Sequence, residues 1–346
     1  GNAPEIPGVR PIPVTRLRLL PGSDGSFPGM VWMALRALVL LARNAYDFVH
    51  ALDRACLAAW GIRRLIRGPF LCDVGLLRSE ELEASNHRFD RWRAAAVRRI
   101  EQRVLSSASL VVADCASLCE AVLSRAPSAR VMRVDDAPME SLVPDHRARA
   151  DAVRRDLEVG DRKCIVYAGR LDRESGVELL LRAMYHVVRQ EPDAVLVLVG
   201  GRDRGIRHMR SLAQRLDLAG HCLFVGRRPL EDMPVYMDLA SVVVAPRLRG
   251  ARASMKVALY MQSGRPIVAT RIPAHTQVLD ADCAILTPVQ VDDLAAGLVR
   301  ALREPLLGCT MGREAQNRVA QNYNAATFKS RIRAAYQRAA EGAEAA

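Results

Sequence analysis

The sequence predicts an α/β protein built from two doubly wound domains that face one cleft. Short apolar runs alternate with helical stretches, which is typical of parallel sheets covered by helices on both faces. The alternation occurs in two series, over residues 46–134 and 162–303, with an interruption between them. At 346 residues the chain is also too long for one ordinary core.

Composition restricts the classes of function. Half of the residues are hydrophobic and a quarter are charged, as in globular proteins. The net charge of +12 favours anionic partners such as phosphates or acidic lipid headgroups. Aromatic residues make up 5% of the chain, too few for a surface on which nucleic-acid bases stack, so nucleic acid is not an expected partner. Most of the excess charge is Arg along helical stretches such as 91–103, which we interpret as a solvated helix face.

The eight Cys residues show neither a C-x-x-C motif nor the Cys and His spacing of a zinc site. Most lie inside apolar runs, so we expect reduced, buried thiols and no metal site. No signal peptide opens the sequence. These features together predict a cytoplasmic protein.

The first domain is predicted over residues 1–140. A candidate strand over 15–20 precedes a helix over 28–43, which is too short and too charged to span a bilayer. This helix either packs on the sheet or, through Trp32, Arg36 and Arg43, makes peripheral contact with an anionic membrane at its inner surface. The elements that follow are strands over 46–52, 69–73, 110–113 and 130–134 and helices over 56–66, 88–107 and 115–124.

The second domain is predicted over residues 161–308. Prolines at 138 and 144 precede a charged segment, so we interpret residues 141–160 as a linker. A helical tail over 309–346 is expected to pack back on the first domain. The predicted elements are strands over 164–168, 194–199, 222–225, 241–245, 267–269 and 284–286 and helices over 176–189, 205–216, 232–239, 254–263 and 291–303.

Four loops that combine Gly with Arg follow strands of the second domain. They begin at Gly169-Arg170, Gly200, Gly226-Arg227 and Ala245, and the last contains Gly250 and Arg252. The carboxyl ends of parallel strands share one edge of the sheet, where ligands of such sheets bind. The fourth loop also leads into a helix that starts near Ser254, and a helix N-terminus attracts anions. The loops therefore predict a phosphate or diphosphate site.

Several motifs resemble the nucleotide-sugar domain of retaining glycosyltransferases of GT-B fold, carbohydrate-active family four (glycosyltransferase group one). The similarity covers 162–303 well and 46–134 faintly. The motifs that carry it are Val166-Tyr-Ala-Gly-Arg-Leu-Asp172, Val197-Leu-Val-Gly200, Phe224-Val-Gly-Arg227, the run from Met255-Lys256 to Thr270, and His275-Thr-Gln-Val-Leu279.

The resemblance implies two Rossmann-like domains and transfer of a sugar, with retention, from a nucleotide diphosphate donor to a glycan, lipid or small-molecule acceptor. It implies that Arg170 contacts the diphosphate, that the loop from Gly250 to Met255 donates backbone amides to it, and that Arg227 lies near the nucleobase. Gly169 and Lys256 complete the expected donor site. Such a site stabilises the leaving diphosphate without a metal ion, and the donor is a co-substrate rather than a cofactor.

The sequence departs from this family at four positions. Ala251 and Leu259 stand where the family carries two Glu residues, Ser175 stands where a Lys often follows the Arg, and Gly75 stands where the first domain carries a His. The glycine-rich first strand, turn and helix are also missing, so we expect an incomplete first domain. The alternative hypothesis is therefore a catalytically impaired relative that binds nucleotide or partners without turnover.

Two side chains have open interpretations. His50 ends a predicted strand, so it either acts as a catalytic group near the acceptor or is a hydrogen-bonded histidine of the fold. Lys256 either faces the donor phosphates or extends along the helix surface to water.

Overall fold

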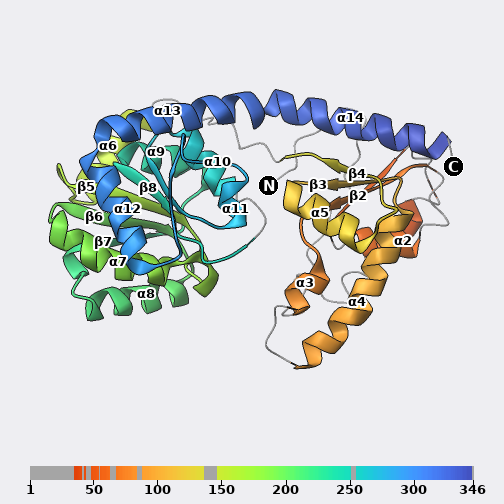
Figure 1. Cartoon of the computed structure of the whole chain (residues 1–346), viewed down its shortest axis with the longest axis horizontal. Coiled ribbons are helices and arrows are strands. Elements are labelled where there is room, and N and C mark those ends of the chain that lie inside the picture. Colours follow the sequence, from red (N-terminus) through yellow and green to blue (C-terminus); the bar gives the residue numbers. More distant parts are fainter. Residues whose placement is uncertain are drawn as a thin grey trace. The chain divides into compact units, whose positions relative to one another are not determined.

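The computed structural model describes residues 35–40, 43, 48–53, 55–62, 68–83, 88–135, 146–250 and 255–344. The chain divides into two compact units. Unit 1 comprises residues 1–134 and 330–346, and unit 2 comprises residues 135–329. Each unit contains its own parallel sheet with helices around it (Figure 1).

Unit 1 has a four-stranded sheet in the order β1-β2-β3-β4, and every neighbouring pair is parallel. Apolar side chains of β2 and β3 are buried on both faces of this sheet. The strands are β1 (Val49–Leu52), β2 (Phe70–Val74), β3 (Leu110–Ala113) and β4 (Val131–Arg133). The helices are α2 (Ala55–Gly61), α3 (Arg78–Glu83), α4 (Arg88–Ser107) and α5 (Ala116–Arg125). The predicted strand over 15–20 and most of the predicted helix over 28–43 lie outside the described residues.

Unit 2 has a six-stranded parallel sheet in the order β10-β9-β8-β5-β6-β7. Its strands are β5 (Lys163–Gly169), β6 (Ala194–Gly200), β7 (Cys222–Gly226), β8 (Val242–Ala245), β9 (Ile267–Thr270) and β10 (Ile285–Thr287). Its α-helices are α6 (His146–Asp156), α7 (Val177–Gln190), α8 (Asp203–Arg215), α9 (Met233–Leu239), α10 (Met255–Gln262), α11 (Pro273–Thr276), α12 (Val291–Arg303) and α13 (Pro305–Asn322). Short 3-10 helices are η2 (Arg173–Ser175), η3 (Ala219–His221) and η4 (Leu230–Asp232).

Both faces of the second sheet are buried, as the continuous apolar runs predict. Ile165 and Tyr167 of β5 point to one core, and Cys164 and Val166 point to the other. This alternation follows from the two-residue period of a strand. The parallel sheets, and the α/β class with them, are therefore confirmed.

Two segments differ from the prediction. The segment expected as a linker contains helix α6, which belongs to unit 2 and packs against α9. The sequence shows α6 as a charged stretch, but Ala150 is buried and Val153 packs against the core, so the helix has an apolar side. The tail is two helices, α13 and α14 (Ala325–Glu344), and α13 packs on α10 in unit 2.

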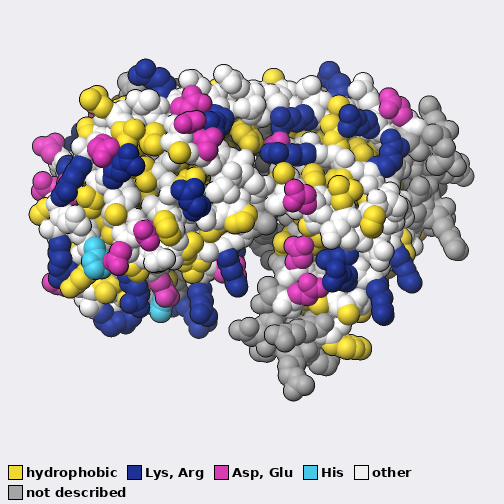
Figure 2. Space-filling model, in the orientation of Figure 1, with side chains coloured by type: hydrophobic (Ala, Val, Ile, Leu, Met, Phe, Trp, Pro, Cys, Tyr) yellow, Lys and Arg dark blue, Asp and Glu magenta, His cyan; other side chains and the backbone are white. Residues whose placement is uncertain are grey.

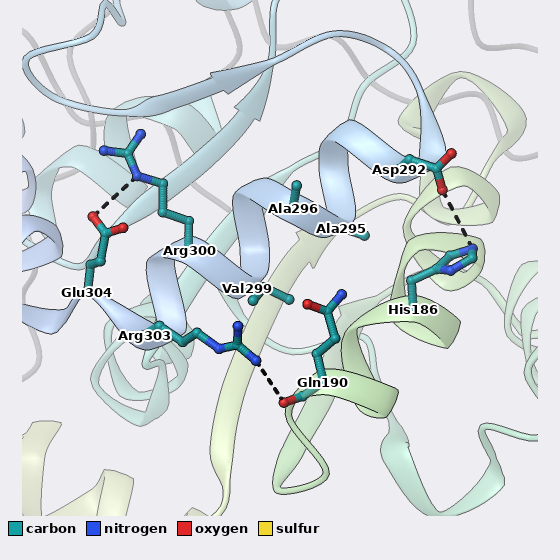
Figure 3. A pocket seen from close by; sticks show the side chains of 9 residues that line it. All are labelled: His186, Gln190, Asp292, Ala295, Ala296, Val299, Arg300, Arg303 and Glu304. Carbon is teal, nitrogen blue, oxygen red and sulfur yellow. Dashed lines mark hydrogen bonds and ion pairs between the residues drawn. The ribbon is translucent and has the colours of Figure 1, made fainter.

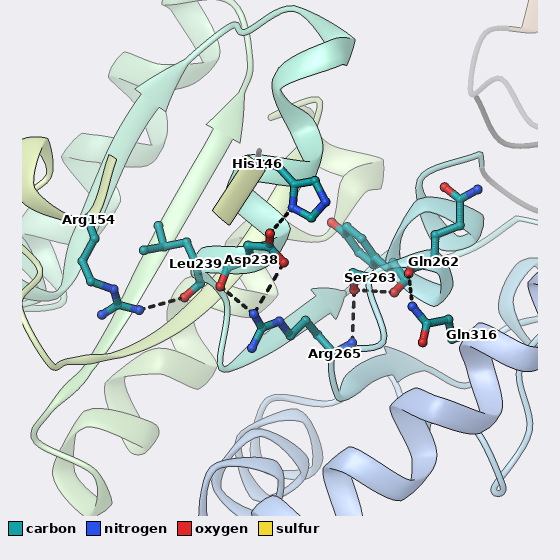
Figure 4. A network of polar contacts seen from close by, with 9 residues as sticks. His146, Arg154, Asp238, Leu239, Gln262, Ser263, Arg265 and Gln316 are labelled. Carbon is teal, nitrogen blue, oxygen red and sulfur yellow. Dashed lines mark hydrogen bonds and ion pairs between the residues drawn. The ribbon is translucent and has the colours of Figure 1, made fainter. Parts of the chain in front are cut away.

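A polar network connects α6 and the end of α10 to the rest of unit 2 (Figure 4). His146 Nδ1 bonds to the Asp238 carboxylate, and Arg265 donates to the Asp238 carbonyl at 2.8 Å. The Arg265 amide donates to Ser263 Oγ at 3.2 Å, and Gln316 of α13 donates to the Gln262 carbonyl at 2.9 Å. These bonds fix the C-terminal end of α10 from two sides.

Surface charges are distributed rather than collected. On the face that Figure 2 shows, Lys and Arg side chains are interspersed with Asp and Glu. Within the described ranges, no helix is long and apolar enough to cross a membrane. All eight Cys are free thiols; six are buried, Cys119 is half-buried and Cys309 is exposed.

Candidate functional site

The strand order of unit 2 reverses between β5 and β8. The chain runs from β5 to β6 and β7 on one side, and then returns to β8 on the other side of β5. In sheets of this kind, ligands bind in a crevice outside the carboxyl ends of the strands at this reversal. Gly169 and Arg170 follow β5 and Gly250 follows β8, so the topology brings three predicted site residues to this position.

The loop after β5 is held by its own side chains. Gly169 ends the strand at a φ of 153°, and a Cβ there would lie 2.9 Å from Tyr167 Oη. The Tyr167 hydroxyl donates to the Arg170 carbonyl at 2.6 Å. Asp172 and Ser175 form a capping box, each accepting the other's backbone N–H at 3.0 Å. The loop is therefore fixed before any ligand arrives.

Arg170 extends from this fixed loop into solvent. Its side chain is 79% exposed, and its Nε lies 3.0 Å from Asp172 Oδ2. An exposed ion pair of this kind contributes little to stability, roughly 0–1 kcal/mol. The guanidinium can exchange this contact for a phosphate at small cost.

The loop after β8 is fastened on both sides as far as residue 250. The Leu248 amide donates to the Glu174 carbonyl at 3.2 Å, and Arg249 donates to the Glu174 carboxylate at 2.9 Å. The Gly250 carbonyl accepts from the Ala274 amide at 2.9 Å. Residues 251–254, which include the predicted Arg252 and Ser254, lie outside the described residues.

Close backbone approach joins the two loops. Gly176 has a φ of 75°, and a Cβ at this position would lie 1.7 Å from the Pro246 carbonyl oxygen. Only glycine fits both this conformation and this contact. The crevice therefore depends on one residue without a side chain.

Helix α10 begins at the crevice. Tyr260 is fully buried and its hydroxyl accepts from the Ala168 amide at 2.8 Å, which ties the helix to the end of β5. Met255, the first residue, is 51% exposed. Lys256, the second, is half-buried, with Nζ 4.5 Å from the centroid of the Tyr167 ring and 3.5 Å from its hydroxyl. The positive end of the helix and Lys256 thus meet at one place.

The pKa values of two basic side chains near the start of α10 are lowered. Burial lowers the pKa of the Lys256 ammonium to about 8; Arg247 and Arg170 lower it further, and Asp172 opposes the shift. Burial also lowers the pKa of His275 to about 4. Both shifts show that the crevice disfavours further positive charge.

His275 is neutral and fully buried. Its Nδ1 lies 2.7 Å from the Thr270 carbonyl, which can only accept, so Nδ1 carries the proton. Its Nε2 has no hydrogen-bond partner among the residues that the structure describes. Thr270 in turn donates from its hydroxyl to the Arg247 carbonyl at 2.5 Å. The pair therefore supports the loop after β8.

Two predicted residues lie apart from this cluster. Arg227 is exposed after the edge strand β7, two strands from β5 or about 10 Å at ordinary strand spacing. His50 lies in β1 of unit 1, where its Nδ1 is 2.9 Å from Tyr336 Oη and its Nε2 is 3.4 Å from Asp73 Oδ2. The structure thus places His50 second in β1 rather than at its carboxyl end, with Nδ1 hydrogen-bonded and Nε2 without a hydrogen bond to any described residue.

A cavity of about 400 Å³ lies elsewhere in unit 2, between α7 and α12 (Figure 3). Its charged lining is paired: Arg300 with Glu304 at 3.3 Å, and His186 with Asp292 at 3.8 Å. Arg303 pairs with Glu191 at 2.6 Å. Because these charges are already compensated, this cavity is a weaker candidate than the crevice. No group of three His, Cys, Asp or Glu in the described part of the chain could hold a metal ion.

Sequence reasoning missed Tyr167 and Asp172 as parts of the site. In the sequence, Tyr167 resembles the other core residues of an apolar strand. It is, however, the only aromatic residue of β5. Asp172 and Ser175 have the three-residue spacing of a capping box, a signal that was present in the sequence. Ser175, at a position where the family often carries Lys, therefore has a structural use.

Comparison with known proteins links the second part of the chain to glycosyltransferases. Residues 162–304 match the family described as glycosyl transferases group 1. A GDP-mannose-dependent alpha-(1-6)-phosphatidylinositol monomannoside mannosyltransferase of Mycolicibacterium smegmatis is 29% identical over 197 residues, covering 55% of this chain and 50% of that protein. A phosphatidyl-myo-inositol mannosyltransferase of Mycobacterium tuberculosis is 32% identical over 165 residues, covering 46% and 43%. The chain thus spans about half the length of these curated relatives.

Solved structures share the fold. Sucrose-phosphate synthase from Thermosynechococcus elongatus has a TM-score of 0.78 at 23% identity, covering 94% of this chain and 81% of that one. The Anabaena protein HepE in complex with UDP has a TM-score of 0.75 at 17% identity, covering 90% and 82%. These similarities confirm the GT-B fold for the chain. Residues 162–304 are accordingly a glycosyltransferase group 1 domain.

Proposed function

We propose that the protein is a glycosyltransferase that transfers a sugar from a nucleotide-diphosphate-sugar donor, with retention, to a glycan, lipid or small-molecule acceptor. The observation that carries this proposal is the crevice between β5 and β8. There Gly169, Arg170 and the N-terminus of α10 meet in a cationic site at a strand-order reversal. The matched domain and the relatives named as mannosyltransferases support the same activity.

The crevice suits a diphosphate leaving group. Negative charge develops on the diphosphate as the bond to the sugar breaks, and donors fixed in advance stabilise that charge. Arg170 supplies a permanent cation on a loop that its capping box holds in place. The first turn of α10 and the loop after β8 supply backbone N–H groups. This chemistry needs no metal ion, and metal independence is part of the proposal.

The donor base and the acceptor are proposed by class. HepE binds UDP, and one relative is named as GDP-mannose-dependent, so uridine and guanosine donors are the first to test. The same relative is named for a phosphatidylinositol acceptor. A lipid acceptor and peripheral contact with an anionic membrane are therefore part of the proposal, within a cytoplasmic protein.

Binding without turnover is the second candidate. Leu259 packs among apolar core residues at one position where the family carries Glu. At the crevice the carboxylates of Asp172 and Glu174 are both engaged with Arg side chains. The described residues of the crevice thus provide no unengaged carboxylate for catalysis.

Release of nucleoside diphosphate from UDP-glucose and GDP-mannose, with and without candidate acceptors, tests the proposal. Arg170→Ala should reduce turnover and weaken diphosphate binding by about 10–100-fold, because a hydrogen bond to a charged group contributes about 1.5–3 kcal/mol. Arg173→Ala, which removes an exposed Arg from the adjacent η2, is the matched control. Turnover unaffected by Arg170→Ala contradicts the proposal, and binding without turnover favours the second candidate.

A further inference from the structure

Lys256 has no carboxylate partner. Within the described residues, no Asp or Glu oxygen lies within 4.0 Å of its Nζ, and its recorded contacts are the ring and hydroxyl of Tyr167. Two other cations around the crevice are compensated, Arg170 by Asp172 and Arg249 by Glu174. A half-buried ammonium over an aromatic ring is stabilised by an anionic partner, and the described residues supply none.

Three features of the described residues border this ammonium. Tyr167 covers one side of it, and α10 carries it on its first turn. On the side of the strand end stands Gly169, where a Cβ would lie 3.5 Å from Lys256 Nζ. A side chain at Gly169 would therefore contact both the ammonium and the Tyr167 hydroxyl.

We propose that Lys256 is the titrating cation of the donor site: it binds the donor diphosphate only as an ammonium, so that nucleotide affinity depends on its protonation. This inference rests on the proposed function and adds a residue that acts as a proton-linked switch in it. A diphosphate beside Lys256 supplies the missing counterion and favours the charged form. Binding then takes up a proton at alkaline pH.

Among the described groups around Lys256, we expect only Lys256 itself to change its protonation between pH 7 and 9. Tyr167 on β5 and Tyr260 on α10 have pKa values raised by burial, so both stay neutral. His275 on α11 has a pKa lowered to about 4 and also stays neutral. The charged side chains that act on Lys256 are Arg247 and Arg170, which lower its pKa, and Asp172, which raises it.

The sign and size of the effect follow from linkage. In the free protein the ammonium loses its proton above pH 8, its pKa being lowered to about 8 by burial. In the complex the adjacent phosphate returns the pKa toward its ordinary value of about 10.4. The dissociation constant should then rise about tenfold between pH 7 and pH 9.

Isothermal titration of UDP and GDP at pH 7, 8 and 9 tests this. Wild type should show the tenfold loss of affinity and proton uptake at pH 8. Lys256→Arg should keep the affinity at pH 7 and bind more tightly than wild type at pH 9, because guanidinium does not titrate. Lys256→Met should bind about tenfold more weakly than wild type at pH 7 and show no pH dependence from this side chain. Ionisation of the nucleobase acts equally on all three proteins, so their differences isolate Lys256.

Three other outcomes would each overturn a proposal. Nucleotide binding with the same pH profile in wild type and Lys256→Arg overturns the role of Lys256 and leaves the proposed function standing. Full affinity in Lys256→Met at pH 7 does the same. If wild type binds neither UDP nor GDP, both proposals are wrong. Thermal unfolding without ligand verifies that each variant is folded.

Discussion

The carboxyl edges of the two parallel sheets carry different kinds of polar side chain. In unit 2 the edge carries Arg170, Lys256 and close-packed glycines, and no described Asp or Glu forms an ion pair with Lys256. In unit 1, Asp73 lies near the end of β2 and contacts His50, the second residue of β1, whose Nδ1 bonds to Tyr336 of α14. Parallel sheets offer this edge for binding in both cases.

The difference teaches what each edge can bind. Excess positive charge at a helix N-terminus suits a phosphate, which the unit 2 edge can hold by backbone and side chain together. A histidine, a carboxylate and a hydroxyl suit a neutral hydroxyl-bearing molecule, which they can hydrogen-bond in either direction. We therefore expect donor binding to respond to changes in unit 2 and to be indifferent to changes in unit 1.

The buried ion pair of unit 1 should give the largest stability effect. Arg125 donates to Glu101 at 2.9 Å, and both side chains and Ser79 are buried. Glu101→Gln leaves Arg125 charged and uncompensated, which costs about 3–5 kcal/mol. Urea unfolding measures the loss. Glu83→Gln, which breaks the exposed 3.6 Å pair with Arg98, should cost under about 1 kcal/mol. Equal effects would show that Arg125 is not dependent on Glu101.

His275 should make unit 2 sensitive to acid. Its pKa of about 4 lies below the unfolded value of about 6.5, so below pH 6.5 the unfolded chain binds the proton first. Stability is lost as the pH falls from 6.5 to 4, by up to about 3 kcal/mol. His275→Gln should flatten this part of the stability profile, measured by urea unfolding at each pH. His208→Gln, at an exposed His, should leave it unchanged; a profile that His275→Gln does not alter would contradict the assignment.

Substitution of Gly176 should lower both the stability of unit 2 and its affinity for UDP. Gly176→Ala places a methyl group against the Pro246 carbonyl at a φ of 75°, which strains the backbone by about 1–3 kcal/mol. The two loops separate, so both stability and UDP affinity should fall. Gly220→Ala is the control because nothing lies within 4 Å of its Cβ. Unchanged UDP affinity in Gly176→Ala would mean that the crevice does not bind the donor.

Tyr336 should give the smallest effect. Tyr336→Phe removes the hydroxyl that lies 2.9 Å from His50 Nδ1 and keeps the ring that packs edge-on against Phe48. The loss should be about 1 kcal/mol of unfolding free energy, with UDP affinity unchanged. A fall in UDP affinity would contradict the separation of roles between the two edges.

The sequence predicted most of the architecture because apolar periodicity determines it. Helices α4 and α12 begin and end at the predicted residues, and strand β3 does as well. Helix α6 was missed because its buried positions are few and its charges are many. Two helices were joined into one tail because the short break at Tyr323 carries neither Gly nor Pro.

The site was predictable only in part. Glycine followed by arginine is a visible signal, and it located the crevice at Gly169 and Arg170. The contact of Gly176 with Pro246 and the position of Lys256 over Tyr167 join residues about 70 and 90 positions apart, which no local pattern contains. The roles of Arg227, Arg252, Ser254 and Met255 stay predictions.

A crystal structure of the protein grown with UDP or GDP tests the central claim most directly. The account predicts that the diphosphate lies between β5 and β8, with Arg170 and Lys256 on its oxygens and the first turn of α10 pointing at it. A diphosphate bound elsewhere, or a crevice filled by the side chains of residues 251–254, would contradict the account.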